Sequence, residues 1–536
     1  MKFSILNSQF SILFVIALFS LPVAAQDEES FPMQSCTSIM VGKKASTDGS
    51  VITSHTCDGR YRTWMTVEPA ADHPKDALVA IHKGTAHTVS PDDTTGVRLA
   101  GYIPQVPHTY AYLNSAYPCM NEKQLAIGET TFGGPDTLRN PHAMFLIEEL
   151  ERIVLQRCSR ARDAVLLIGD LVRQYGYADG GECITIADRD EIWQLEILGS
   201  GHDQIGAVWV AQRVPDDHVA VSANIPRIGR LMPTDSKNFL CSDNVQAVAL
   251  RYGLWDGKGE FLFWKAYNPE YAQGRNFRER EYFILNTLVP SAHLSYDQPQ
   301  LPFSLRPDSL VSARQVMALL RSTYEGTDMD MCQNIKMPKK SKMPDGTLRI
   351  DTVISPVANP WITSTMMNTI NTIAPGTIDF KRTVSVAWCS YSFVAQLRGW
   401  LPDPVGGVCW VAFDNPGQSP HIPIFSGTTA LPSAFAACGQ KAYNPEAVIW
   451  KFRRANKLAT LAWQATKGVH NEVILSEEEK AFKGLDALEQ SVMQISSDAP
   501  KTASLLNDYT DSVFRSTVSA WERLESTYWH RFGMGF

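Results

Sequence analysis

The order of strand-like and helix-like segments is the feature that most limits the fold available to this chain of 536 residues. Short strand patterns come first, two amphipathic helices follow, more strands come next, and the C-terminal part is helical in three segments. This order predicts an α+β fold in which antiparallel sheets are layered with helices. The strand patterns lie at 36–42, 50–55, 125–132, 182–188, 191–198, 206–214, 218–224, 382–397 and 406–414, the helical patterns lie at 143–158, 160–176, 275–281, 311–326 and 444–536, and residues 326–382 are predicted to be rich in loops.

The first 35 residues have the pattern of a removable leader. In residues 1–25, Lys2 precedes an apolar run from 10 to 21, and the small residues Val23, Ala24 and Ala25 follow, which is typical of a secretory signal peptide. Residues 26–35 are polar and acidic, and we expect them to be a short propeptide. Because the apolar run is short for a membrane span, a signal anchor is the less favoured alternative. The pattern predicts export to the periplasm or the cell exterior, with no stable membrane insertion afterwards.

Composition sets broad limits on the mature protein. Removing 35 residues from 536 leaves 501, which is more than a usual single core and indicates one large elaborated domain or two domains. The formal net charge is −7 and no long basic run occurs, so nucleic acid is not an expected partner.

The ten cysteines show no spacing typical of a metal site. An exported chain could pair them in disulfides, but Cys183, Cys389 and Cys409 lie in apolar strand patterns, where a buried free thiol is favoured. We therefore expect no metal and no cofactor.

Cys36 lies where removal of the leader could make it the first residue of the mature chain. Its thiol and its own α-amino group would then belong to one residue. An α-amino group has an unperturbed pKa of about 7.7–8.0 and can act as a base near neutral pH. Cys36 could therefore supply both the nucleophile and the general base for cleaving an amide bond.

The segment after Cys36 predicts a hairpin, because two strand patterns flank the turn sequence STDG. Its second strand would bring His55 and Asp58 back toward Cys36. Asp58 could accept a hydrogen bond from the α-ammonium group or from a substrate amine, although a solvated turn aspartate is the alternative. His55 could be a base or a structural histidine, and the sequence leaves both interpretations open.

Further polar residues stand at predicted strand ends, where site residues commonly project. Asn121 precedes the strand at 125–132, and Glu129 and Thr131 lie toward its far end. Thr131 could donate to an oxyanion or be an ordinary β-branched strand residue. Asn224 could donate its amide to an oxyanion or cap a turn. Arginines in the segment GRNFRERE fit a solvated helix face as well as a site.

Several segments together resemble the cysteine dipeptidase family of N-terminal nucleophile (Ntn) hydrolases, which is related to penicillin V acylase and bile-salt hydrolase. The resemblance implies a four-layer αββα sandwich in residues 36–440, with a C-terminal helical extension at 441–536 packed on it, and autocatalytic removal of the propeptide. The segments, in chain order, are CTSIMVGKKASTDGS, HTCDG, MNEKQLAIGETTFGG, GECITIADRDEIWQLEI, VSANIPRI, SVAWCSYSFVAQLRGWLPDPVGGVCWVAFDNP and HIPIFSG.

The resemblance also assigns roles to individual residues. Cys36 matches the nucleophile, Asp58 the aspartate that contacts the α-amine, and Asn224 the oxyanion asparagine. Arg275 matches the site arginine of the acylase relatives, with Arg278 as the alternative alignment. The chain departs from the relatives at two positions. It has His55 where they carry an arginine, and Thr131 where they carry a second oxyanion asparagine.

The resulting expectation is an exported dipeptidase that hydrolyses the amide bond of small dipeptides. An acylase or amidase of the same fold, acting on N-acyl amino acids or related amides, is the first alternative. An exported binding protein in which Cys36 is only disulfide-bonded is the second. A homo-oligomer is possible, since Trp521, Tyr528 and Trp529 could form an interface, although packing on the protein's own core is favoured for these residues.

Overall fold

A computed structural model describes residues 35–270, 278–495 and 498–535. The predicted signal peptide at 1–25, the propeptide at 26–35 except Ser35, and Arg275 lie outside the described residues. Within them the chain forms several antiparallel sheets and eleven α-helices, which confirms the predicted α+β class. In the described residues no helix is both long enough and apolar enough to cross a bilayer.

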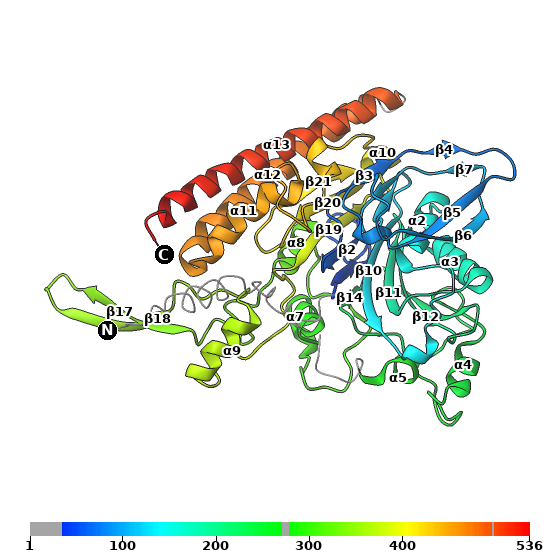
Figure 1. The fold of residues 1–536 in the computed structure, drawn as a ribbon, viewed down its shortest axis with the longest axis horizontal. Helices are drawn as coiled ribbons and strands as arrows, with labels where there is room; N and C mark the ends of the chain where they lie inside the picture. The colour runs from blue at the N-terminus through cyan, green and yellow to red at the C-terminus, as the bar shows by residue number, and fades with distance from the viewer. Residues whose placement is uncertain (1–34, 271–277, 496–497, 536) are drawn as a thin grey trace, which may run out of the picture.

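Two large sheets form the centre of the molecule (Figure 1). Strand β2 of the first sheet contacts β10 and β11 of the second, so the two sheets pack against each other. The first sheet contains, in spatial order, β16 (Ser304–Leu305), β14 (Val219–Ser222), β1 (Ser38–Val41), β2 (Val51–Asp58), β19 (Cys389–Leu397), β20 (Gly407–Phe413) and β21 (Ile422–Phe425). The second contains β15 (Phe239–Cys241), β13 (Ala207–Val214), β12 (Ile192–Gly199), β11 (Gly181–Ala187), β10 (Ala126–Gly133), β9 (Met120–Asn121), β8 (Tyr112–Asn114) and β3 (Thr66–Glu68).

The predicted hairpin after Cys36 is confirmed. Strands β1 and β2 pair antiparallel with Val41 opposite Ile52, and an isolated bridge joins Thr37 to Thr56. All eight residues of β2 are buried, because β1 and β19 flank it within the sheet and both of its faces are covered. The strand is therefore long enough to return Asp58 to the level of Cys36.

Helices cover the sheets on their other sides. Helices α2 (Ile147–Arg157) and α3 (Ala161–Tyr175) pack together, and α3 contacts β11, β12 and β13. Helix α7 (Arg278–Leu288) contacts β14, and α8 (Ala313–Leu320) contacts β2 and β19. Helices α4 (Val245–Arg251), α5 (Phe263–Tyr267), α9 (Ser364–Ile373) and α10 (Asp403–Gly406) complete this part of the chain.

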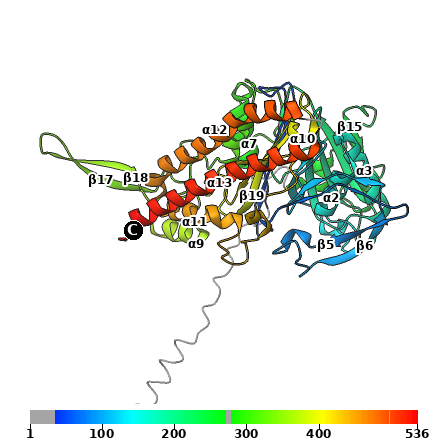
Figure 2. The ribbon, with the colours of Figure 1, turned by 90° about the horizontal axis from the view of Figure 1, so that it is seen from above.

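The predicted three-helix C-terminal part is also confirmed. Helices α11 (Val448–Thr460), α12 (Trp463–Ile495) and α13 (Ala499–Phe532) lie side by side and contact β20 and β21 (Figures 1 and 2). Trp521 and Tyr528 are buried in the protein's own core, as favoured from the sequence, whereas the side chain of Trp529 is exposed.

The prediction that residues 326–382 are rich in loops is wrong in part. Strands β17 (Lys336–Lys342) and β18 (Leu348–Ile354) form a hairpin that projects from the body of the molecule, and α9 follows it (Figures 1 and 2). Pro338 lies within β17. A two-stranded hairpin has only edge strands, and an edge strand tolerates the missing N–H of proline. The remaining pairs are β4 (Ala71–Asp72) with β7 (His108–Thr109) and β5 (Leu78–Lys83) with β6 (Arg98–Pro104).

Candidate active site

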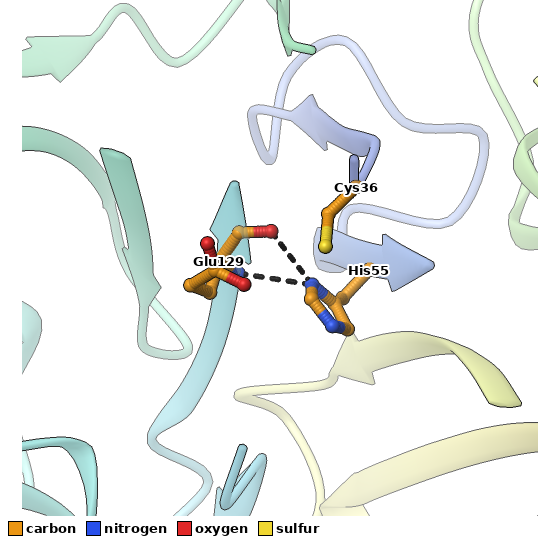
Figure 3. Close-up of side chains that lie close together, drawn as sticks. All are labelled: Cys36, His55 and Glu129. Atoms are coloured by element: carbon orange, nitrogen blue, oxygen red, sulfur yellow. Dashed lines mark hydrogen bonds between the residues drawn. The ribbon is translucent and has the colours of Figure 1, made fainter. Parts of the chain in front are cut away.

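The side chains of Cys36, His55 and Glu129 come together where strands β1 and β2 of the first sheet face strand β10 of the second (Figure 3). One ligand-type atom from each side chain lies within 4.8 Å of the other two. Cys36 precedes β1, His55 lies in β2, and Glu129 lies in β10. All three side chains are buried. The group therefore joins residues that are 19 and 93 positions from Cys36 along the chain.

The surroundings of the Cys36 thiol disfavour its ionised form. Burial raises the pKa of the thiol well above its ordinary value, and the neighbouring carboxyl group of Glu129 raises it further. A protonated thiol is a weak nucleophile and needs a base that removes its proton. None of the ten cysteines, all of which are described, forms a disulfide, so the thiol of Cys36 is free to react.

His55 is held as a neutral ring. Its Nδ1 lies 2.7 Å from the carbonyl oxygen of Glu129 and 3.1 Å from the Glu129 backbone nitrogen. Burial lowers the pKa of His55 to about 4, and the rings of Tyr117, Tyr391 and Phe393 pack around it. Cys36, His55 and Glu129 are close enough to hold a metal ion. The backbone of Glu129 contacts Nδ1 of His55, whereas Nε2 has no hydrogen-bond partner among the described residues.

Asp58 and Arg382 bind the residue before Cys36. The Arg382 guanidinium donates to the carbonyl oxygen of Ser35 at 2.9 Å and to the Asp58 carboxylate at 2.7 Å. The hydroxyl of Thr56 donates to the same Asp58 oxygen, and the backbone N–H of Ser35 donates to the Asp58 carbonyl oxygen. The second carboxylate oxygen of Asp58, Oδ1, has no hydrogen-bond partner among the described residues. The Ser35–Cys36 peptide bond is thus fixed from its N-terminal side.

Arg280 binds the other side of Cys36. Its guanidinium donates to the Cys36 carbonyl oxygen at 2.5 Å, to the Thr37 hydroxyl at 3.0 Å and to the side-chain oxygen of Asn224 at 2.7 Å. Burial and the nearby Arg382 lower the pKa of Arg280 to about 9. Asn224 has a left-handed backbone with φ of 64°, and its amide donates to the Thr131 carbonyl oxygen. Arg280 therefore orients the Asn224 amide toward β10.

Glu129 continues into a second buried carboxyl group, that of Glu182. Thr131 pairs with Glu182 across β10 and β11, and Glu129 stands two residues before Thr131, so the three side chains share one face of the sheet. The Thr131 hydroxyl donates to Glu129 at 3.2 Å. Burial raises the pKa of both carboxyl groups, and the charge of Glu129 raises that of Glu182 further. Burial and the charge of the neighbouring group therefore both oppose ionisation of the two carboxyl groups at once.

A cavity of about 390 Å³ adjoins this carboxyl pair. Thr131 and Glu182 line it, together with Tyr61, Tyr117 and glycines at positions 84, 133, 134, 180, 181 and 199. Its volume lies in the range of small-molecule sites. Thr131 and Glu182 connect the cavity to Glu129 and so to the group that contains the thiol.

The structure thus brings together most of the residues selected from the sequence: Cys36, His55, Asp58, Glu129, Thr131 and Asn224. It places Asn121 elsewhere. The Asn121 amide donates to the carbonyl oxygens of Leu155 and Cys158, and its side-chain oxygen accepts from Lys123 and Leu125, so it holds the turn before β10 against α2.

Sequence reasoning missed two arginines and the second glutamate. Arg280 lies in the charged segment from which Arg275 and Arg278 were considered, but charge alone could not select it. Arg278 instead donates to carbonyl oxygens of the loop at 296–299. Arg382 begins the strand pattern at 382–397 and Glu182 begins the strand pattern at 182–188, so the only signal was a charged residue at the edge of an apolar run.

The antiparallel sheets, and a buried thiol among carboxyl and guanidinium groups, are features of a cysteine-type hydrolase. Residues 35–475 match the profile of Peptidase family C69, and the chain therefore belongs to that peptidase family. It is 25% identical over 424 residues to a probable dipeptidase of Latilactobacillus sakei, covering 76% of this chain and 78% of the relative. It is 25% identical over 454 residues to probable dipeptidase B of Streptococcus pyogenes serotype M1, covering 80% of each. Dipeptidase A of Lactobacillus helveticus is 24% identical over 466 residues, covering 83% of this chain and 85% of the relative.

Proposed function

We propose that this protein is an exported dipeptidase whose Cys36 becomes the first residue of the mature chain. The observation that carries the proposal is the clamp that Asp58 and Arg382 form on Ser35, directly before the thiol. The family relationship supports peptide substrates, since relatives that align over most of the chain are named dipeptidases. The packed sheets with outer helices support an Ntn-type four-layer sandwich, and the pattern of residues 1–25 supports export.

The chain removes its own propeptide in two steps. The Cys36 sulfur attacks the Ser35 carbonyl carbon, and a thioester forms as the Ser35–Cys36 amide bond breaks, which frees the Cys36 amine. Water then hydrolyses the thioester and leaves a carboxylate on Ser35 and a free thiol on Cys36. The Arg382 guanidinium, already 2.9 Å from the Ser35 carbonyl oxygen, stabilises the negative charge that develops there.

The new α-ammonium group on Cys36 can donate a hydrogen bond to the Asp58 carboxylate. Asp58 Oδ1 lacks a hydrogen-bond partner among the described residues while Ser35 is attached. A buried carboxylate oxygen without a donor is costly, and an ammonium group on Cys36 would satisfy it. Asp58 thereby holds the amine close to the thiol.

Turnover uses the same thiol with the free amine as base. The neutral amine accepts the thiol proton, through a bridging water, while the sulfur attacks the scissile carbonyl of the dipeptide. The amine returns the proton to the departing amino group, and a thioester remains on Cys36. Water then hydrolyses this thioester and releases the first amino acid. Asn224, oriented by Arg280, stabilises the oxyanion together with a donor from Thr131.

The first test is the N-terminal sequence and intact mass of the purified protein, combined with hydrolysis of Ala-Ala. Wild type is expected to begin at Cys36 and to release alanine. Cys36→Ala is expected to keep the residues before position 36 that its signal processing leaves, and to release none. The matched control is Cys438→Ala, which removes a thiol that lies only partly buried and outside the Cys36, His55 and Glu129 group.

Two results would contradict the proposal. Unchanged Ala-Ala hydrolysis by Cys36→Ala would remove Cys36 from the mechanism. A fully active wild-type chain that retains residues before Cys36 would remove the α-amine from it.

A further inference from the structure

The cavity beside Thr131 and Glu182 has more acidic than basic side chains in its lining. Its lining contains the carboxyl groups of Asp136, Glu148, Asp179 and Glu182, against the single guanidinium of Arg139. Glu182 is 3% exposed, and its Oε2 has no hydrogen-bond donor among the described residues. Oε2 of Glu129, the residue between Glu182 and the thiol, lacks a donor in the same way.

We propose that Glu129 and Glu182 bind the free α-ammonium group of the substrate's first residue, so that the enzyme requires an unblocked N-terminus. The inference rests on the proposed dipeptidase function and names the subsite that selects its substrates. The two glutamates present oxygens that need donors, and an ammonium group brings three.

The position of the pair fits the geometry of a dipeptide. The α-nitrogen and the scissile carbonyl carbon are separated by two bonds, which places them about 2.5 Å apart. Glu129 has a carboxylate oxygen within 4.8 Å of the Cys36 and His55 atoms that complete the group. An ammonium group bound by Glu129 therefore presents the adjacent carbonyl to the sulfur, while the first side chain extends into the cavity.

Position separates the pair from the other acidic groups of the cavity, because Glu129 groups with the thiol and His55, and Glu182 stands beside it on the same sheet face. The Asp179 carboxylate accepts from the backbone N–H groups of Gly180 and Ile147. Burial raises the pKa of Glu148, as it also raises those of Glu129 and Glu182, so ionisation does not distinguish these groups. Glu129 and Glu182 remain as buried acceptors next to the thiol, and an arriving ammonium group would stabilise their ionised forms.

An N-acylated substrate would fit this subsite poorly. Its amide nitrogen carries no charge and a single N–H, so buried carboxylate oxygens would stay without donors. Leaving such groups unpaired is the most effective way for a site to reject an analogue. The subsite therefore distinguishes a dipeptidase from an acylase of the same fold.

The test compares kcat/KM for Ala-Ala and for propionyl-alanine, which lacks only the α-amino group. Wild type is expected to prefer Ala-Ala strongly. Glu182→Gln should lower kcat/KM for Ala-Ala about tenfold or more, since one charged hydrogen bond is lost, and should leave propionyl-alanine nearly unchanged. The matched control is Glu151→Gln, because Glu151 is equally buried, also lacks donors among the described residues, and does not line the cavity.

Calorimetry on the wild-type protein gives a second readout that needs neither turnover nor a folded variant. L-Alaninamide is expected to bind and propionamide is not, and equal binding of the two would overturn the inference. Equal kcat/KM values for Ala-Ala in wild type and Glu182→Gln would also overturn it while the dipeptidase function stands. A wild type that cleaves propionyl-alanine but not Ala-Ala would overturn both.

Discussion

At the scale of single residues, two buried arginines donate hydrogen bonds to the backbone on either side of the Ser35–Cys36 peptide bond. Arg382 binds the carbonyl oxygen of Ser35 and Arg280 binds that of Cys36. The Asp58 carboxylate offsets the charge of Arg382, and the Asn224 side-chain oxygen accepts from Arg280. Such close packing of two cations is expensive to bury and indicates a role beyond stability.

Replacing Arg382 by lysine should slow removal of the leader. Lysine keeps the charge but cannot bridge Ser35 and Asp58 with a planar fork. Loss of one donor to a developing oxyanion costs about 100-fold in rate. Intact mass measured over time on freshly purified precursor would give this rate. Arg213→Lys is the control, because Arg213 forms ion pairs with Glu191 and Asp216 on the second sheet. Equal rates for Arg382→Lys and wild type would contradict the role.

The pH dependence of turnover should identify the base. Burial lowers the pKa of His55 to about 4, so its ring is already neutral above about pH 5. If His55 were the base, kcat/KM would rise with pH near pH 4. If the Cys36 α-amine were the base, with an ordinary pKa of about 7.7–8.0, kcat/KM would rise near neutral pH or above. His55→Asn is therefore expected to keep the limb of the kcat/KM profile at the same pH, even where the rate falls. A limb that disappears in this variant would make His55 the base.

The sequence could predict the part of the site that depends on local spacing. Cys36 and Asp58 face each other because one hairpin carries both, and the turn sequence with its flanking strand patterns predicts that hairpin. Asn224 and Glu129 were selected as polar residues near strand ends. Arg280 and Arg382 reach Cys36 only through tertiary packing, from 244 and 346 residues away. Nothing local distinguishes them from other arginines.

At the scale of elements, periodicity predicted the helices well and the projecting hairpin poorly. The helices α2, α3 and α8 carry apolar residues at helical spacing against a core, and their positions follow the predicted patterns. Strand β17 has no core to face: six of its seven residues are exposed. A strand without a buried face leaves no alternating pattern in the sequence.

The C-terminal helices should depend on Trp521. Its side chain is 0% exposed, and its indole N–H donates to Asn456 of α11 at 2.9 Å. The ring also packs on Phe452 and His470. Trp521→Ala should lower the free energy of unfolding by about 3–5 kcal/mol, measured by denaturant titration. Trp529 on the same helix is 58% exposed, and Trp529→Ala should change it by no more than about 0.5 kcal/mol. Similar losses in both variants would contradict this assignment.

At the scale of the whole molecule, the site and the hairpin β17–β18 belong to different parts of the protein. Cys36 lies between two packed sheets, whereas the hairpin extends away from them (Figures 1 and 2). The hydrophobic clusters of buried residues contain no residue of 336–354. The hairpin carries exposed Leu348 and Ile350 together with several lysines. We therefore predict that folding and catalysis do not depend on the hairpin.

Shortening the hairpin tests this separation. Lys336 pairs with Ile354, so an Asn-Gly turn can replace residues 337–353 without changing the distance between the strands. The melting temperature should stay within about 2 °C of wild type, because no buried apolar contact is lost, and kcat/KM for Ala-Ala should be unchanged. Light scattering on both proteins would measure the oligomeric state. If wild type forms an oligomer and the shortened chain a monomer, the hairpin is the interface. If kcat/KM falls while the oligomeric state is unchanged, the hairpin serves the active site instead, and the separation argued here is wrong.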